Sequence, residues 1–266
     1  MTPTFNFTKI SDYGTENYIV ARLSLQIFQI LEHCKIDEAK SDSIKSIYVD
    51  QLMPQLIHCW EIEEKYRRAF NQQVQSYEDS MKSGKRGLLP FIPPLEQECH
   101  NFLYEYKNFV RNLLGVFNIL YGTAFIGAGQ FYPKNIKQDS VIKYAESEFG
   151  ISDPKTIFLK DAETNIRSYL AMRDAVEHPG GGCGTLRVSN FVQGSDLIVD
   201  EPCWWREENG NEIDKNSIRL GFEIGIHDLL TLAEDILISW ANEHLLIPGR
   251  MHIIHIPKEQ RKKTVQ

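Results

Sequence analysis

An arginine and a histidine near the middle of the chain have the types and the spacing for anion binding and proton transfer. They lie in the segment YLAMRDAVEHP, residues 169–179. Arg173 follows Leu170 by three residues and Tyr169 by four, so helical geometry places its guanidinium on the apolar face. An unpaired buried charge costs several kcal/mol. The spacing therefore predicts that Arg173 has a specific anionic partner.

His178 follows Arg173 by five residues, which on a continuous helix would turn its side chain about 140° away from the arginine. Pro179 disfavours the α conformation at the residue before it, so the imidazole can turn back toward the guanidinium. The partial negative charge at a helix C-terminus favours the imidazolium, and so does Asp174, four residues earlier. A histidine that changes charge near neutral pH is suited to proton transfer.

The residues Arg173, Asp174 and His178 resemble the R-x4-6-H motif of the HEPN superfamily (higher eukaryotes and prokaryotes nucleotide-binding domain). In that family a polar residue often follows the arginine directly, as Asp174 does here. The resemblance covers residues 95–179 and extends neither to the first 90 residues nor to the region after Pro179. It implies a helical bundle. It also implies a metal-independent endoribonuclease of a bacterial defence or toxin–antitoxin system, as many HEPN proteins are.

The resemblance further implies roles for the three residues. His178 would transfer a proton at the ribose 2′-hydroxyl or at the leaving 5′-oxygen, Arg173 would bind the scissile phosphate, and Asp174 would orient the pair. No metal ion or other cofactor is implied. A helix C-terminus repels phosphate, so the site needs two arginines from a symmetric homodimer. The implied partners are therefore a second copy, an RNA substrate and an antitoxin or other regulatory protein.

A non-catalytic interpretation of the same residues stays open. Arg173 would then form a salt bridge with a carboxylate such as Glu177 or Glu105, and His178 would cap a helix end. The chain would be a helical protein-interaction module whose hairpin region contacts a partner. The ribonuclease needs Arg173 and His178 to be solvent-accessible at a two-fold interface, whereas the module allows them to be buried with satisfied partners.

Two neighbouring motifs are candidates for substrate binding. The glycines of PGGGCGT, among them Gly181 and Gly182, could cradle an anion with consecutive backbone N–H groups and form a wall of a cleft at His178. The alternative is a simple turn from a helix into a hairpin, because the Lys-Ser/Thr pair of a nucleotide-triphosphate loop is missing. Trp204 and Trp205 could stack on bases, or could cover the buried face of the hairpin.

Composition narrows the possible classes of protein. The chain has 266 residues, of which 42% are hydrophobic and 24% charged, as in ordinary globular proteins. Its net charge of −7 argues against a broad nucleic-acid-binding surface, so any role with RNA must be local. The five cysteines form no C-x-x-C pair, which favours reduced thiols. No apolar run is long enough to span a membrane, and we expect a cytoplasmic protein.

The periodicity of apolar residues predicts a mainly α fold, a helical bundle with a small antiparallel β-hairpin or sheet late in the chain. We expect a single helical domain over 1–266, with N-terminal helices in 1–93, a HEPN-like core in 95–179, a β-hairpin insertion in 183–206 and a C-terminal helix in 226–246. The stretch 37–82 reads as two helices meeting near Pro54, or as one kinked helix. We expect helices over 138–149 and 161–177, a polar connection over 207–216 and a last strand over 251–256.

Overall fold

The computed structural model describes residues 11–84, 88–132, 139–194 and 199–248. Most of them are helical, and a small antiparallel sheet follows late in the chain, which confirms the predicted fold class. The strand predicted over 251–256 lies outside the described residues. Among the described helices, none is both long enough and apolar enough to cross a bilayer.

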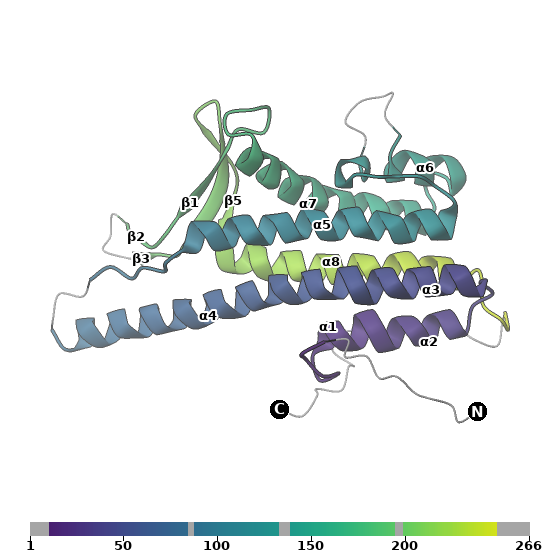
Figure 1. Cartoon of the computed structure of the whole chain (residues 1–266). Coiled ribbons are helices and arrows are strands. Elements are labelled where there is room, and N and C mark those ends of the chain that lie inside the picture. Colours follow the sequence, from purple (N-terminus) through teal and green to yellow (C-terminus); the bar gives the residue numbers. More distant parts are fainter. Residues whose placement is uncertain (1–10, 85–87, 133–138, 195–198, 249–266) are drawn as a thin grey trace.

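Long helices that lie side by side make up the body of the molecule (Figure 1). The helices α5 and α8 lie at the centre of the bundle, because each contacts α4 and α7 and they contact each other. The α-helices are α1 Tyr18–Val20, α2 Ile27–Glu32, α3 Glu38–Ser46, α4 Met53–Lys82, α5 Leu95–Tyr121, α6 Val141–Glu148, α7 Pro154–Glu177 and α8 Ile218–Ala241.

The predicted break near Pro54 is a π-helical segment rather than a kink between separate helices. The helix α3 continues into the π-helix Ile47–Leu52, which leads directly into α4, with Pro54 in the first turn of α4. Proline has no N–H for the carbonyl four residues earlier and crowds it. A wider π turn just before the proline relieves this conflict without ending the helix.

The helix that carries the candidate motif begins earlier than predicted. We expected it over 161–177, but α7 starts at Pro154, because Asp153 caps its N-terminus by accepting a hydrogen bond of 2.8 Å from the Lys155 amide. Proline at the first helical position also suits this start. The apolar periodicity of its first turns is weak, which explains why the sequence pattern missed them.

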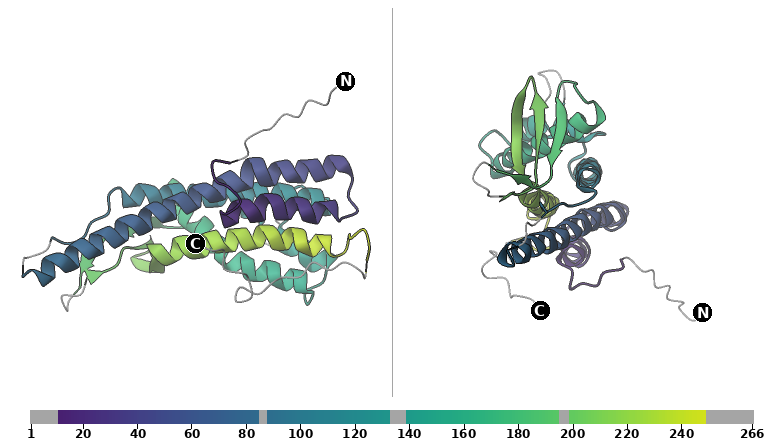
Figure 2. Two further views of the ribbon diagram at one scale, coloured as in Figure 1. Left: turned by 90° about the horizontal axis from the view of Figure 1, so that it is seen from below. Right: turned by 90° about the vertical axis from the view of Figure 1, so that its left-hand side faces the viewer.

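The predicted hairpin exists and belongs to a three-stranded sheet. Its strands are β1 Thr185–Ser189, β4 Cys203–Glu208 and β5 Asn211–Ser217, antiparallel in the order β1-β4-β5. The short strands β2 Val192–Gln193 and β3 Val199–Asp200 pair with each other. The sheet contacts the end of α7 and the start of α8 (Figures 1 and 2).

The predicted polar connection over 207–216 is wrong. Asn209 and Gly210 have φ of 51° and 78°, and Glu208 pairs with Asn211 on either side of them, so they form a tight two-residue hairpin turn. The strand β5 that follows is polar because it is an edge strand whose side chains are largely exposed. A polar composition is therefore compatible with an edge strand.

The C-terminal helix also differs from the predicted range of 226–246, since α8 begins at Ile218 and ends at Ala241. Gly221 and Gly225 lie in its first turns and weakened the helical pattern. A Cβ atom on Gly221 would lie 2.6 Å from the Trp204 ring, and one on Gly225 would lie 3.0 Å from the Phe102 ring. These glycines let two large aromatic rings approach the helix.

An aromatic cluster joins α5, α7, α8 and the sheet. The rings of Phe102 and Phe222 are 4.5 Å apart, those of Tyr106 and Tyr169 stack at 4.3 Å, and Trp204 packs edge-on against Phe222 at 5.4 Å. The Tyr169 hydroxyl donates a hydrogen bond of 2.6 Å to the Gly221 carbonyl. This cluster fixes the sheet against the end of α7.

Adding one methyl group at Gly221 tests this packing. We expect Gly221→Ala to lower the free energy of unfolding by about 1–3 kcal/mol, because the new Cβ atom would collide with the rigid Trp204 ring. Gly115→Ala is the matched control on α5, where the nearest side-chain atom is at 3.4 Å, and we expect it to be neutral or to stabilise by up to about 1 kcal/mol. Urea unfolding of both variants measures the difference, and equal effects would contradict the packing argument.

Candidate functional site

The end of α7 has the backbone geometry that Pro179 predicts. His178 is the C-cap, with φ −130° and ψ 66°, outside the α region. Its N–H still donates to the Asp174 carbonyl at 2.9 Å, and its own carbonyl accepts from the Gly181 N–H at 2.9 Å. The helix therefore ends abruptly at a histidine whose backbone is held on both sides.

The side chain of His178 is left open to solvent. The residue is exposed, and within the described part of the chain its imidazole takes part in no hydrogen bond or ion pair. A ring nitrogen in this position can donate to or accept from a bound molecule without breaking an internal bond. Exposure of His178 is what the catalytic interpretation requires of it.

Arg173 lies on the inward face of α7, as its spacing predicts, and only 8% of it is exposed. The solvent access that the ribonuclease interpretation requires of Arg173 is therefore absent in this chain, whereas His178 has it. Its guanidinium forms an ion pair with Glu177 and lies over the ring of Tyr104 from α5, with Cζ 4.8 Å from the ring centroid. Asp174 Oδ1 lies 3.8 Å from Arg173 Nη1. Glu105, the other carboxylate considered, lies 3.3 Å from His58 instead.

Burial lowers the pKa of the Arg173 guanidinium below its ordinary value, while Tyr104 and Asp174 oppose that shift. The group remains protonated, because a guanidinium does not lose its proton in a protein. Its charge is therefore desolvated and needs the nearby carboxylates. Neither its Nε nor its Nη1 makes a hydrogen bond within the described residues, although Nη1 is ion-paired with Glu177.

A second cation reaches the same carboxylates from α5. Lys107 Nζ lies 3.5 Å from Glu177 Oε2 and 3.7 Å from Asp174 Oδ1. We call Lys107, Arg173, Asp174 and Glu177 the α7 charge cluster. Two cations and two carboxylates make it neutral overall, so in the single chain it has no net charge with which to attract a phosphate.

The glycine turn after His178 uses most of its amides internally. Gly180 N–H donates to the Gly184 carbonyl at 2.9 Å and to Thr185 Oγ1 at 3.0 Å, and Gly184 N–H donates to the Gly181 carbonyl at 2.9 Å. The Gly181 amide is also engaged, whereas the Gly182 amide donates to no group among the described residues. The arrangement is a helix-to-hairpin turn and not a ready anion cradle.

The two tryptophans lie on opposite faces of the sheet. Trp204 is 1% exposed and packs in the aromatic cluster, so it cannot stack on a base, and the prediction that Trp204 binds substrate is wrong. Trp205, the next residue of β4, is half-buried on the outer face, where Lys215 Nζ lies 5.1 Å from its ring. Only Trp205 remains a candidate for contact with a ligand.

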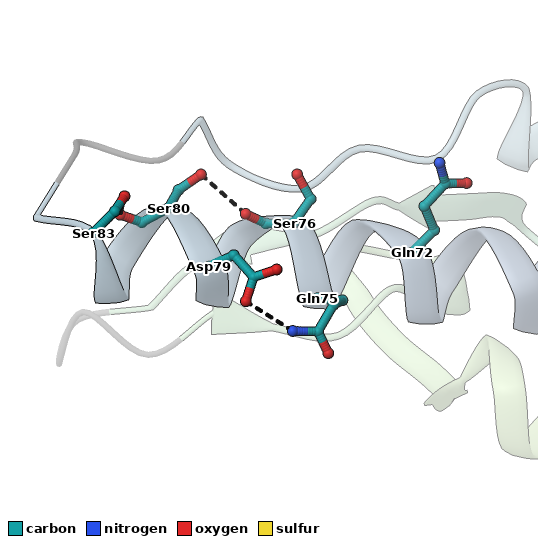
Figure 3. A pocket seen from close by; sticks show the side chains of 6 residues that line it. All are labelled: Gln72, Gln75, Ser76, Asp79, Ser80 and Ser83. Atoms are coloured by element: carbon teal, nitrogen blue, oxygen red, sulfur yellow. Dashed lines mark hydrogen bonds between the residues drawn. The ribbon is translucent and has the colours of Figure 1, made fainter.

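Other features of the described chain do not form a better site. A hollow of about 540 Å³ runs along the C-terminal half of α4 (Figure 3). Four of its six polar side chains bond within the helix: Gln75 with Asp79 at 2.9 Å, and Ser80 and Ser83 with backbone carbonyls at 2.9 and 2.8 Å. No group of three or more metal-ligating side chains occurs in the part of the chain that the structure describes.

Two members of the site come from α5 and were missed by the sequence analysis. Tyr104 and Lys107 are three residues apart and therefore lie on one face of that helix. Nothing in their spacing shows that this face lies against α7. The signal would have to come from the pairing of the two helices, which is a tertiary contact.

Removing the Glu177 carboxylate tests the burial of the Arg173 charge. We expect Glu177→Ala to lower the free energy of unfolding by about 1–2 kcal/mol, because the buried guanidinium loses its main partner. The matched control is Glu163→Ala, which removes the i,i+4 partner of the exposed Arg167 on the same helix, and it should cost less than about 0.5 kcal/mol. Equal losses in thermal or urea unfolding would show that the Arg173 charge does not depend on Glu177.

No family model, curated protein or solved structure matches this chain. The similarity of Arg173, Asp174 and His178 to the HEPN motif therefore stays a prediction.

Proposed function

We propose that the end of α7 is one half of a metal-independent endoribonuclease site of the HEPN type, in a cytoplasmic protein of a bacterial defence or toxin–antitoxin system. The observation that carries the proposal is the exposed imidazole of His178, held at the break of a helix one and a half turns after Arg173. A second copy of the chain would supply the other half.

The chemistry assigned to His178 is proton transfer. The ribose 2′-hydroxyl attacks the adjacent phosphorus as its proton is removed, the bond to the 5′-oxygen breaks, and a proton is delivered to that leaving oxygen. One histidine from each copy could serve the two transfers. The nucleophile is part of the substrate, so DNA, which lacks the 2′-hydroxyl, would not be cut. The products are a 2′,3′-cyclic phosphate and a 5′-hydroxyl.

Asp174 acts on the geometry of this pair. Its carbonyl accepts the His178 N–H at 2.9 Å, and its carboxylate lies between Arg173 and Lys107. It therefore connects the end of the helix to both cations. This arrangement supports a positioning role for Asp174 rather than direct contact with the substrate.

Arg173 can bind a phosphate only if Glu177 gives up its place. The Glu177 carboxylate is an anion held between Arg173 and Lys107, which is where a phosphate oxygen would bind. Glu177 is the last residue of α7, so its release requires only the final helical position to change. Glu177 thus competes with the substrate phosphate inside the free chain.

The second candidate function is a non-catalytic helical module that binds another protein. It is favoured by the burial of Arg173 and its ion pair with Glu177, which satisfy the guanidinium within one chain. In that case the α7 charge cluster only stabilises the contact between α5 and α7. The two functions differ in whether His178 is needed for any reaction.

A cleavage assay without metal tests the ribonuclease. Purified protein is incubated with total RNA in excess EDTA, and we expect cleavage that falls by about 100-fold or more in His178→Ala, the usual contribution of a proton-transfer group. His33→Ala is the matched control, because His33 is also an exposed histidine at a helix C-cap, and it should retain full activity. Cleavage that is equal in both variants, or absent from the wild type, would favour the module.

Competition by Glu177 predicts a gain of binding. In the His178→Ala background, which prevents turnover, we expect Glu177→Gln to bind single-stranded RNA about fivefold more tightly, because the phosphate no longer has to displace a carboxylate. Glu163→Gln on the same helix should leave the affinity unchanged. Weaker binding by Glu177→Gln in a folded protein would contradict the competition.

A further inference from the structure

A hollow of about 490 Å³ opens on the outer face of the sheet, away from the end of α7. It lies where β1, β4 and β5 approach the start of α8. The residues that matter most for its chemistry are Ser189, Asp200, Trp205, Lys215, Asn216 and Ser217. Trp205 is the aromatic side chain among those that line it.

An irregularity in the backbone of β5 places the Lys215 ammonium group over the Trp205 ring. Between the pairs Trp204–Asn216 and Arg206–Ile213, the single residue Trp205 faces two residues of β5, which is a β-bulge. One of these two, Asp214, has a φ of 57°, a conformation that few residues other than glycine adopt. Bulges re-aim the side chains beside them, and here Lys215 Nζ comes to lie 5.1 Å from the ring centroid.

The floor of the hollow offers hydrogen-bonding groups beside the ring. The Ser217 hydroxyl oxygen is buried and has no hydrogen-bond partner among the described residues. Asn216 is paired with Trp204, so its side chain lies on the opposite face of the sheet from Trp205, where its Oδ1 accepts the Ser217 N–H at 2.9 Å. A flat ligand on Trp205 could therefore be held at its edge by the Ser217 hydroxyl.

The charges around the hollow are slightly negative, because Asp200 lines it in addition to two ion pairs. Lys215 Nζ lies 2.9 Å from Glu212 Oε2, and Arg219 Nε lies 3.9 Å from Glu201 Oε2. This excess of negative charge does not favour a phosphate group at the bottom of the hollow, and Lys215 already supplies the cation that a tryptophan ring attracts. The chemistry that remains suits a neutral aromatic ring with a polar edge.

We propose that this hollow binds a nucleobase of single-stranded RNA, stacked on Trp205. The inference rests on the proposed function for its substrate class. The strand β1 connects the two places, because it begins at Thr185, which is hydrogen-bonded to Gly180 beside His178, and ends at Ser189 in the hollow. Its four steps span about 13 Å, so one RNA strand that follows β1 reaches both sites.

The test is the affinity of the His178→Ala chain for a fluorescein-labelled oligouridylate, measured by anisotropy. We expect Trp205→Ala to weaken binding about tenfold or more, because a base–aromatic stack is lost, and Trp205→Phe to keep most of the affinity. Trp60→Ala, which changes a partly exposed tryptophan on α4, is the matched control and should not weaken binding. Circular dichroism verifies that each variant is folded.

Further outcomes separate this inference from the proposed function. Unchanged affinity in folded Trp205→Ala overturns the base site, even if cleavage depends on His178. Loss of affinity in Trp205→Ala supports the base site, even if the wild type cleaves no RNA. Two other results also overturn the base site. One is a loss of affinity in Trp205→Ala that is as large for an oligolysine peptide as for the oligouridylate, and the other is no binding of the oligouridylate by the His178→Ala parent chain.

Discussion

The buried charge of Arg173 at the end of α7 is the constraint on which the candidate site depends. A guanidinium on the inward face of a helix is stable only beside carboxylates, and Glu177 and Asp174 provide them from the same helix. Tyr104 and Lys107 of α5 complete its surroundings. The guanidinium that would bind a phosphate is therefore present, but in the free chain it is ion-paired with Glu177.

The same constraint explains the division of labour between Arg173 and His178. The helix must continue to Glu177 to keep the ion pair, and it must stop directly afterwards to free the histidine. Pro179 and the glycine turn meet both demands within a few residues. The Arg173 side chain is therefore held in an ion pair, while the His178 side chain is exposed. In this account, activity depends on exchanging an internal carboxylate for an external phosphate.

Local patterns in the sequence were enough to predict part of this arrangement. The inward position of Arg173, the departure of His178 from the α region and the late hairpin all follow from spacing and from Pro179. The roles of Tyr104 and Lys107 did not follow, because they depend on which face of α5 lies against α7. Which of Trp204 and Trp205 is buried could likewise not be predicted, because it depends on the close approach of Gly221 to Trp204, a contact between distant segments. The Asn209–Gly210 turn is a local signal, and here polar composition wrongly outweighed it.

A crystal structure of the chain bound to single-stranded RNA with 2′-O-methyl groups, which cannot be cut, tests the central claim most directly. The account predicts a phosphate oxygen within hydrogen-bond distance of the Arg173 guanidinium, with the Glu177 carboxylate displaced and the His178 imidazole facing a ribose. An intact Arg173–Glu177 pair with RNA bound elsewhere would contradict it.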